Sequence, residues 1–206
     1  MTVPGRIALA THNRHKLREL ARICADWPTE WISVENHDPA AFPDVEEIGD
    51  TYLENASLKA RAVSAALGLP AMADDSGIEV DGLGGRPGPR SARYAGEHAS
   101  DEENLRALIQ ALAGIPASGR TARYRCVAAI AWPGGQLQHA EGLCEGTLRT
   151  APTGTRGFGY DPVFVPVGWD LTMAELTDDQ KDRISHRGRA FRALRSALDA
   201  GISPEG

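Results

Sequence analysis

Cysteine is scarce in this 206-residue chain, which contains only Cys24, Cys126 and Cys144. The three are widely spaced and form no C-x-x-C pair, so neither a disulfide framework nor a cysteine-based zinc site is expected. Reduced thiols are typical of cytosolic proteins. The cytoplasm is therefore the expected compartment.

Long apolar runs are missing as well. No stretch approaches 18 consecutive apolar residues, and the apolar segment after Arg6 is too short for the core of a signal peptide. Neither a membrane-spanning helix nor a membrane partner is expected.

Blocks of like charge are also absent from the sequence. The net charge is −6 and no run of like charges reaches five, which argues against nucleic acid as a partner. Small anionic ligands remain possible, because a pocket can be positive inside an acidic protein. Only Lys16, Lys59 and Lys181 among the 22 basic residues are lysines, which makes each of them worth examining.

The residues that are present follow an α/β pattern. With 42% apolar and 24% charged residues the composition is that of a globular protein, and we expect a single domain over residues 1–206. Strands that alternate with helices, plus a hairpin, indicate a mixed sheet. Apolar spacing predicts strands over 7–10, 31–34, 71–73, 122–132, 136–144 and 163–165, and helices near 17–24, 51–67, 100–112, 174–184 and 191–198.

Capping patterns support two of these helices. Thr51 with Glu54, and Ser100 with Glu103, have the spacing of a capping box. Gly68 follows the second helix at the position where a glycine commonly ends one.

Four polar segments lie at the ends of the expected elements, where functional sites are usually built. The first, THNRHK (residues 11–16), forms a strand–turn–helix junction. Its helix N-terminus and the charge of Lys16 suit a phosphate chain, although the glycines of a P-loop are missing. Alternatively, Thr11 or Asn13 only caps the helix.

The second segment, ADDSG, places Asp74 and Asp75 after the apolar run 71–73. Side chains of an extended segment alternate between faces, so one carboxylate is expected to face a site while the other is held behind it. A carboxylate at a strand end suits Mg²⁺ binding or the orientation of water. A turn that uses Asp and Ser as local acceptors is the alternative.

An acidic loop offers a second carboxylate for the same ion. It contains Asp44, Glu46 and Glu47. Mg²⁺ takes few protein ligands beside phosphate oxygens and water, so one further carboxylate is enough. A solvated charge run is the alternative.

The remaining segments suit a purine base. GFGYD (residues 157–161) places two aromatic side chains between glycines, where they can stack on a base or simply close the core. Lys181 together with SHR (residues 185–187) offers donors for the exocyclic oxygens of a base. His186 alone is more typical of a structural histidine than of a functional one.

Together these segments resemble a known family. In this order they are similar to the inosine/xanthosine triphosphate pyrophosphatases, also called dITP/XTP diphosphatases, over nearly the whole chain. The resemblance implies an elongated mixed β-sheet flanked by helices, with two lobes and a central cleft (ITPase-like, Maf/Ham type). It rests on LATHNRHKLREL, ENASLKA, ADDSGIEVDGLGGRPGPRSARYAG, GFGYDPVF and AELTDDQKDRISHRGRAF.

The resemblance also implies a function. Members are Mg²⁺-dependent homodimers that cleave the deaminated purine nucleotides ITP, dITP and XTP to the monophosphate and pyrophosphate. By this resemblance Asp75 is the general base and a metal ligand, with Glu46 as the second metal carboxylate. The substrate-binding residues it implies are Thr11, His12, Asn13, Arg14, His15 and Lys16 for the phosphates, Ser76, and Phe158, Gly159, Tyr160, Asp161, Lys181, His186 and Arg187 for the base.

One position departs from the commonest pattern of the family. His12 stands where many members have glycine, so its backbone must adopt an ordinary conformation or a costly one.

Two other functions remain open. A Maf-like dTTP/UTP pyrophosphatase has a related architecture, but the combination of SHRG and GFGYDP argues against it. A purine nucleotide sensor without turnover is the second, and the intact Asp75, Lys16 and Glu46 argue against that.

Overall fold

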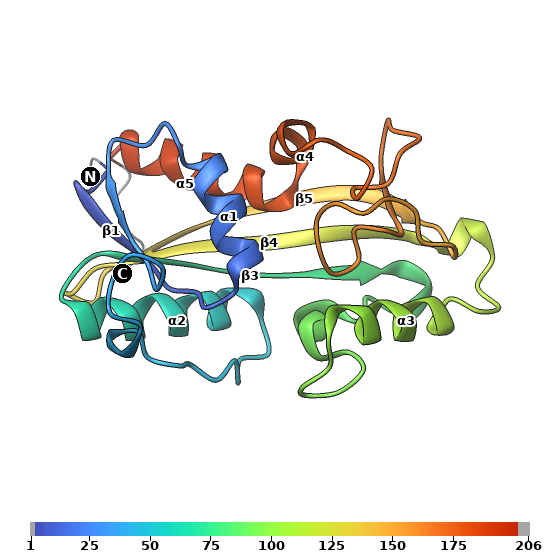
Figure 1. The fold of residues 1–206 in the computed structure, drawn as a ribbon, viewed down its shortest axis with the longest axis horizontal. Coiled ribbons are helices and arrows are strands. Elements are labelled where there is room, and N and C mark those ends of the chain that lie inside the picture. The colour runs from blue at the N-terminus through green and yellow to red at the C-terminus, as the bar shows by residue number, and fades with distance from the viewer. Residues whose placement is uncertain (1–2, 202–206) are drawn as a thin grey trace. The chain divides into compact units, whose positions relative to one another are not determined.

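The computed structural model describes residues 3–201 (Figure 1). In this part of the chain the strands form one six-stranded sheet in the order β2-β1-β3-β4-β5-β6. β1 runs parallel to β2 and β3, whereas β5 and β6 are antiparallel, which confirms a mixed α/β fold. The strands are β1 (Arg6–Leu9), β2 (Glu30–Ile32), β3 (Ala71–Val80), β4 (Thr121–Ala131), β5 (Leu137–Leu148) and β6 (Phe164–Pro166). The α-helices are α1 (Arg14–Ile23), α2 (Tyr52–Leu67), α3 (Asp101–Ala111), α4 (Asp178–Ile184) and α5 (His186–Asp199).

The chain divides into two compact units. The first unit is drawn from residues 1–75, 126–142 and 187–206, and the second from residues 76–125 and 143–186. Strands β3, β4 and β5 each contribute residues to both units. Each unit has its own apolar core.

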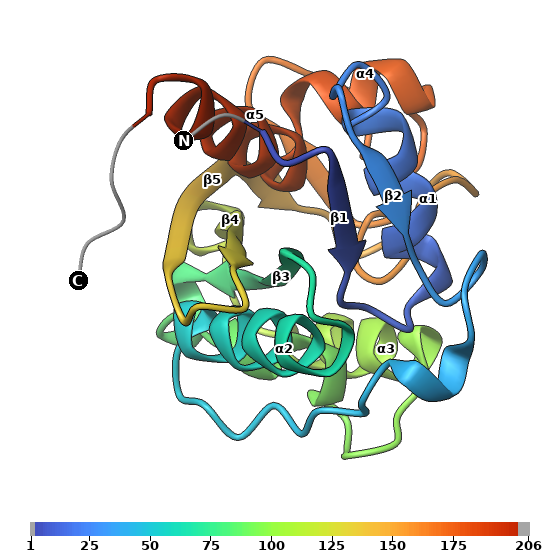
Figure 2. The same cartoon turned by 90° about the vertical axis from the view of Figure 1, so that its left-hand side faces the viewer.

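In the first unit, helices cover both faces of the sheet. Figure 2 shows α5 on one side of the strands and α2 on the other. The alternation along β4 explains this, because Cys126 and Ala128 pack in the core cluster of α1 and α5, whereas Val127 and Ala129 pack with Tyr52 and Ala56 of α2. The strand is therefore buried on both faces here.

In the second unit, α3 packs on the continuation of the strands. Leu108 and Leu112, on α3 and at its end, share a core with Ile78 and Val80 of β3. Tyr124 of β4 belongs to the same core, so this strand carries a phenol group into the apolar interior.

The helix ends confirm the predicted capping. Thr51 and Ser100 both form complete capping boxes, with Glu54 and Glu103 as the reciprocal partners. Gly68 ends α2 with φ +65°, a left-handed conformation that glycine adopts without strain.

Two expectations differ from the structure. β3 does not end at the paired aspartates but continues through them to Val80, because Ile78 and Val80 pack in the apolar core of the second unit. The Gly/Pro-rich loop after β3 is also more ordered than expected, since residues Asp81–Leu83 and Gly88–Arg93 form 3-10 helices. Within residues 3–201, no helix is long and apolar enough to span a bilayer.

Candidate active site

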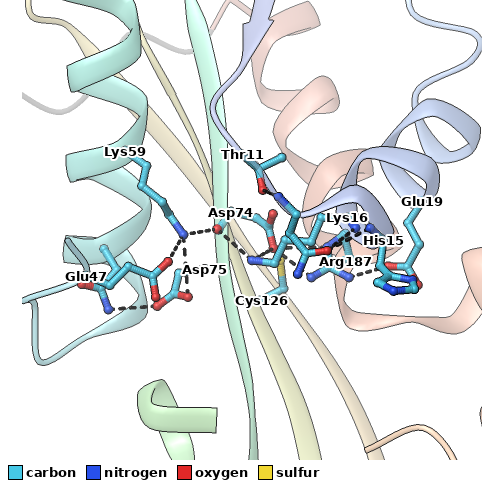
Figure 3. Close-up of polar contacts among 12 residues, drawn as sticks. Thr11, His15, Lys16, Glu19, Glu47, Lys59, Asp74, Asp75, Cys126 and Arg187 are labelled. Carbon is cyan, nitrogen blue, oxygen red and sulfur yellow. Dashed lines mark hydrogen bonds and ion pairs between the residues drawn. The ribbon is translucent and has the colours of Figure 1, made fainter. Parts of the chain in front are cut away.

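The two aspartates of β3 diverge from one another (Figure 3). Asp74 Oδ2 accepts from Arg187 Nε at 3.1 Å and Nη2 at 3.0 Å, and Lys16 Nζ lies 3.2 Å from the same oxygen. Asp75 instead accepts from Asn55 Nδ2 at 3.0 Å. The predicted alternation is confirmed, and it takes place inside a strand rather than at its end.

Asp74 is held as a buried anion. Its side chain is fully buried, and burial alone raises the pKa of a carboxyl group. The charges of Arg187, then Lys16 and Lys59, outweigh burial and hold the Asp74 pKa well below its usual range. Arg187, itself 1% exposed, also pairs with Glu19 of α1, so its guanidinium joins two carboxylates in the first unit.

Asp75 has the opposite electrostatic balance. Burial raises its pKa, and Glu47 adds to that shift, while Lys59, Lys16 and the hydrogen bond from Asn55 lower it. The net result is an Asp75 pKa above its ordinary value. A buried carboxylate of raised basicity is suited to accept a proton.

Lys59 of α2 connects these groups. Its Nζ donates to the carbonyl oxygen of Asp74 at 2.8 Å, pairs with Glu47, and lies 3.9 Å from Asp75 Oδ1. Lys16 Nζ reaches the same Asp74 carbonyl at 3.3 Å, so two ammonium groups share one backbone oxygen. No motif in the sequence predicts a role for Lys59, and only the small number of lysines draws attention to it.

In the acidic loop Glu47 pairs with Lys59, whereas metal binding by Glu46 stays a prediction. The ammonium of Lys59 lowers the pKa of Glu47 against the effect of burial. Glu46 is exposed. Adjacent glutamates in a loop carry no periodic signal, so the sequence offered no basis for choosing between them.

Asn55 was also missed from sequence. It is fully buried, and its Oδ1 accepts from the backbone N–H of Gly49 at 2.8 Å while its Nδ2 donates to Asp75. One amide therefore joins the acidic loop to Asp75. A Cβ on Gly49 would lie 2.7 Å from Asn55 Oδ1, so glycine is required for this close approach.

The segment THNRHK caps α1, as its alternative interpretation predicted. Asn13 Oδ1 accepts from the backbone N–H groups of His15 and Lys16, and Thr11 Oγ1 accepts from Asn13 N. None of the described residues other than glycine has a positive φ, so His12 adopts an ordinary backbone. Phosphate binding by residues 11–16 stays a prediction, as does substrate contact by the half-buried Ser76.

A second cluster lies in the second unit, around Asp161. Its Oδ2 accepts from Lys181 Nζ at 2.5 Å and from the backbone N–H of Phe158 at 2.9 Å, and its Oδ1 accepts from Tyr124 at 3.2 Å. Lys181 Nζ also lies 5.1 Å from the centroid of the Phe158 ring, within cation–π range. We call Tyr124, Phe158, Asp161, Lys181 and His186 the Asp161 cluster.

The two aromatic residues of GFGYD differ in their surroundings. Tyr160 is 5% exposed and belongs to the core, and its hydroxyl donates to the carbonyl of Ser91 at 2.7 Å. Phe158 is half-buried beside Lys181. Asp101, at the start of α3, accepts from the backbone N–H of Gly159 at 3.2 Å and so anchors the loop.

The donor atoms of the first unit fit a magnesium ion. Among residues 3–201, no three His, Cys, Asp or Glu side chains gather to enclose a metal by themselves. Mg²⁺ does not need such a cage, since one or two carboxylates plus phosphate oxygens and water suffice. Asp75 and Glu47 both approach Lys59 Nζ, which shows that two carboxylates can face one positive charge here.

Comparison with known proteins identifies the family of this chain. The profile of the Ham1 family matches residues 7–197. The chain belongs to the Ham1 family. The matched residues of this Ham1-family protein include both clusters, from Lys16 to Arg187.

The relatives of this Ham1-family protein are similar over almost their whole length. A dITP/XTP pyrophosphatase of Streptomyces coelicolor is 50% identical over 191 residues, which cover 92% of this chain and 94% of the relative. A dITP/XTP pyrophosphatase of Bacillus subtilis is 42% identical over 200 residues, which cover 97% and 100%. The Ham1 protein of Coxiella burnetii is 37% identical with a TM-score of 0.84, covering 97% of this chain and 100% of that one. The resemblance drawn from the motifs is confirmed.

Proposed function

We propose that this chain is a nucleoside triphosphate pyrophosphatase that hydrolyses ITP, dITP and XTP to the monophosphate and pyrophosphate. The observation that carries the proposal is Asp75, a buried carboxylate with a raised pKa beside Lys59 and Glu47. The names of the Streptomyces coelicolor and Bacillus subtilis relatives support the same activity.

The reaction follows from the groups of the first unit. Asp75 accepts a proton from a water molecule as the water oxygen bonds to the α-phosphorus. The bond from that phosphorus to the bridging oxygen breaks, and pyrophosphate leaves with the bonding electrons. Lys16 and Lys59 neutralise phosphate charge, which is the main contribution a protein can make to phosphoryl transfer. Asn55 holds Asp75 in place through its amide.

Asp75 and Glu47 are the residues that would hold Mg²⁺. When bound, the ion neutralises charge on the phosphate oxygens and polarises the phosphorus centre. Glu46, which the family resemblance names, is the other candidate for the second metal-binding carboxylate. Substituting Glu46 and Glu47 one at a time shows which of them binds the ion.

Base selectivity is assigned to the Asp161 cluster. Lys181 and His186 are donors suited to the 6-oxo group of hypoxanthine or xanthine. The amino group of adenine at that position would leave a buried donor unpaired, at a cost of about 1–3 kcal/mol. The contribution of Arg187 to the base pocket stays a prediction, because its guanidinium already pairs with Asp74 and Glu19.

A substrate panel tests the proposal. We expect pyrophosphate release with Mg²⁺ from ITP, dITP and XTP, and much slower release from ATP, dTTP and UTP. A preference for dTTP and UTP would establish the Maf-like alternative. Tight binding of ITP without pyrophosphate release would establish the sensor.

The assembly and location are proposed from the family resemblance. We propose a cytoplasmic homodimer in which the two units of each chain act as one domain. Light scattering of the purified protein tests the dimer, and a monomer at micromolar concentration would contradict it.

A further inference from the structure

Tyr124 is a polar side chain in the apolar core of the second unit. It lies on β4 and is 7% exposed, outside every motif that the sequence analysis singled out. Within the Asp161 cluster it contacts His186 and Asp161, and no pattern in the sequence predicts either contact.

The first connection is a parallel ring stack. The ring of Tyr124 lies 4.6 Å from the imidazole of His186, with an interplanar angle of 8°. The N–H groups of an imidazole lie in the plane of its ring. A tyrosine that covers one ring face therefore sets the plane in which His186 can donate or accept a hydrogen bond.

The second connection is the hydrogen bond to Asp161. The Tyr124 hydroxyl donates to Oδ1 at 3.2 Å, while Oδ2 accepts from Lys181 at 2.5 Å. A carboxylate held at both oxygens cannot rotate about its Cβ–Cγ bond without losing a partner. Tyr124 thus fixes the orientation of the Asp161 carboxylate, and with it the position at which Asp161 holds the Lys181 ammonium group.

We infer that Tyr124 is a positioning residue for base selectivity. It orients His186 directly and Lys181 through Asp161, so that both donors meet the 6-oxo edge of the purine. The inference rests on the proposed function, because it assigns a role within the base pocket of that enzyme. Its effect is expected in discrimination between 6-oxo and 6-amino purines and not in the chemical step.

Two substitutions separate the stack from the hydrogen bond. Tyr124→Phe retains the ring over His186 and removes the bond to Asp161, whereas Tyr124→Leu removes both. Leu108→Ala is the matched control, because Leu108 is fully buried in the same core and lies outside the Asp161 cluster.

The readout is the ratio of dissociation constants for AMP and IMP, measured by calorimetry beside kcat and KM for ITP. We expect Tyr124→Phe to lower this ratio about 5-fold and Tyr124→Leu about 30-fold, since one hydrogen bond and one aromatic pair are each worth about 1 kcal/mol and every 1.4 kcal/mol is tenfold. In Tyr124→Leu we expect KM for ITP to rise while kcat at saturation changes less than about 3-fold. Leu108→Ala is expected to lower the melting temperature and keep the ratio.

Two results would overturn the inference. One is an unchanged AMP/IMP ratio in Tyr124→Leu, and the other is an equal fall of the ratio in Leu108→Ala. Because the ratio comes from binding alone, an absence of pyrophosphate release would contradict the proposed function without affecting this test.

Discussion

At the scale of single residues, the scarce lysines mark the candidate site. Lys16 and Lys59 both donate to the carbonyl oxygen of Asp74, and Lys181 pairs with Asp161. An ammonium group is a compact charge that suits phosphate and carboxylate oxygens. Buried ammonium groups need such partners, which explains why every lysine in this chain lies beside an acidic residue or a carbonyl.

The choice between the adjacent glutamates can be tested with a matched pair. Glu47→Gln removes the carboxylate that pairs with Lys59, whereas Glu46→Gln changes an exposed neighbour. We expect Glu47→Gln to lower kcat/KM for ITP at least about 10-fold and to raise the Mg²⁺ concentration needed for half-maximal activity. Glu46→Gln should stay within about 2-fold of wild type, as substitutions of exposed groups usually do. A larger loss of kcat/KM in Glu46→Gln than in Glu47→Gln would identify Glu46 as the carboxylate that binds the metal.

At the scale of elements, α2 carries two contacts of the site one helical turn apart. Asn55 and Lys59 are four residues apart and so share a face of the helix. The capping box of Thr51 and Glu54 fixes where this helix begins, and Gly49 fixes how closely the acidic loop approaches it. The start of α2 therefore sets the position of the groups around Asp75.

Adding a methyl group at Gly49 is expected to disrupt this arrangement. In Gly49→Ala the new Cβ would lie 2.6 Å from the Cβ of Glu54 and 2.7 Å from Asn55 Oδ1, so the loop must shift. We expect kcat for ITP to fall at least about 10-fold, because small displacements of a catalytic group are costly. Gly134→Ala, where a Cβ meets nothing within 4 Å, is the control and should keep wild-type kcat. Equal activity of the two variants would show that the loop is not coupled to catalysis.

Elements with local signals were predictable from the sequence. The capping boxes of α2 and α3 and the glycine that ends α2 depend on residues within one turn, so their spacing was sufficient. The alternation of Asp74 and Asp75 was likewise a local property of an extended chain. The continuation of β3 to Val80 was not predictable, because it depends on a core supplied by α3 and β4.

Contacts between residues that lie far apart in the sequence could not be predicted from sequence patterns. Tyr124 meets Asp161 from 37 residues away, and Arg187 meets Asp74 from 113 residues away. Such pairings are set by tertiary packing, which neither residue type nor periodicity reveals. For the same reason Asn55 was recognised only through its hydrogen bonds.

At the scale of the whole molecule, each unit carries one kind of chemistry. The charged groups around Asp74 and Asp75 belong to the first unit, and the Asp161 cluster belongs to the second. The chain carries a net charge of −6, yet Lys16, Lys59 and Arg187 gather in the first unit. These cations pair with the carboxylates of Glu19, Glu47 and Asp74, so they stabilise buried negative charge within the unit.

The stability of the whole molecule is expected to depend on acid pH through Asp74. Its pKa is lowered in the folded state, so its ionised form contributes stability above the unfolded value of about 3.9, and this contribution is lost as pH falls through the folded pKa. We expect the free energy of unfolding to fall as the pH is lowered below about 4. Urea titrations from pH 3 to 7 measure it. The Asp74→Asn variant should show a shallower dependence, and an equal slope would assign the effect to other carboxylates.

The most direct test of the account compares Asp75→Asn with Asp74→Asn. We expect Asp75→Asn to lower kcat for ITP by about 10²–10⁴, the usual contribution of a general base, with nucleotide binding and melting temperature near wild type. Asp74→Asn should lower the free energy of unfolding by about 3–5 kcal/mol, because it leaves Arg187 buried beside Glu19 alone. Equal loss of kcat in both variants, at unchanged stability, would contradict the division of roles between the two aspartates.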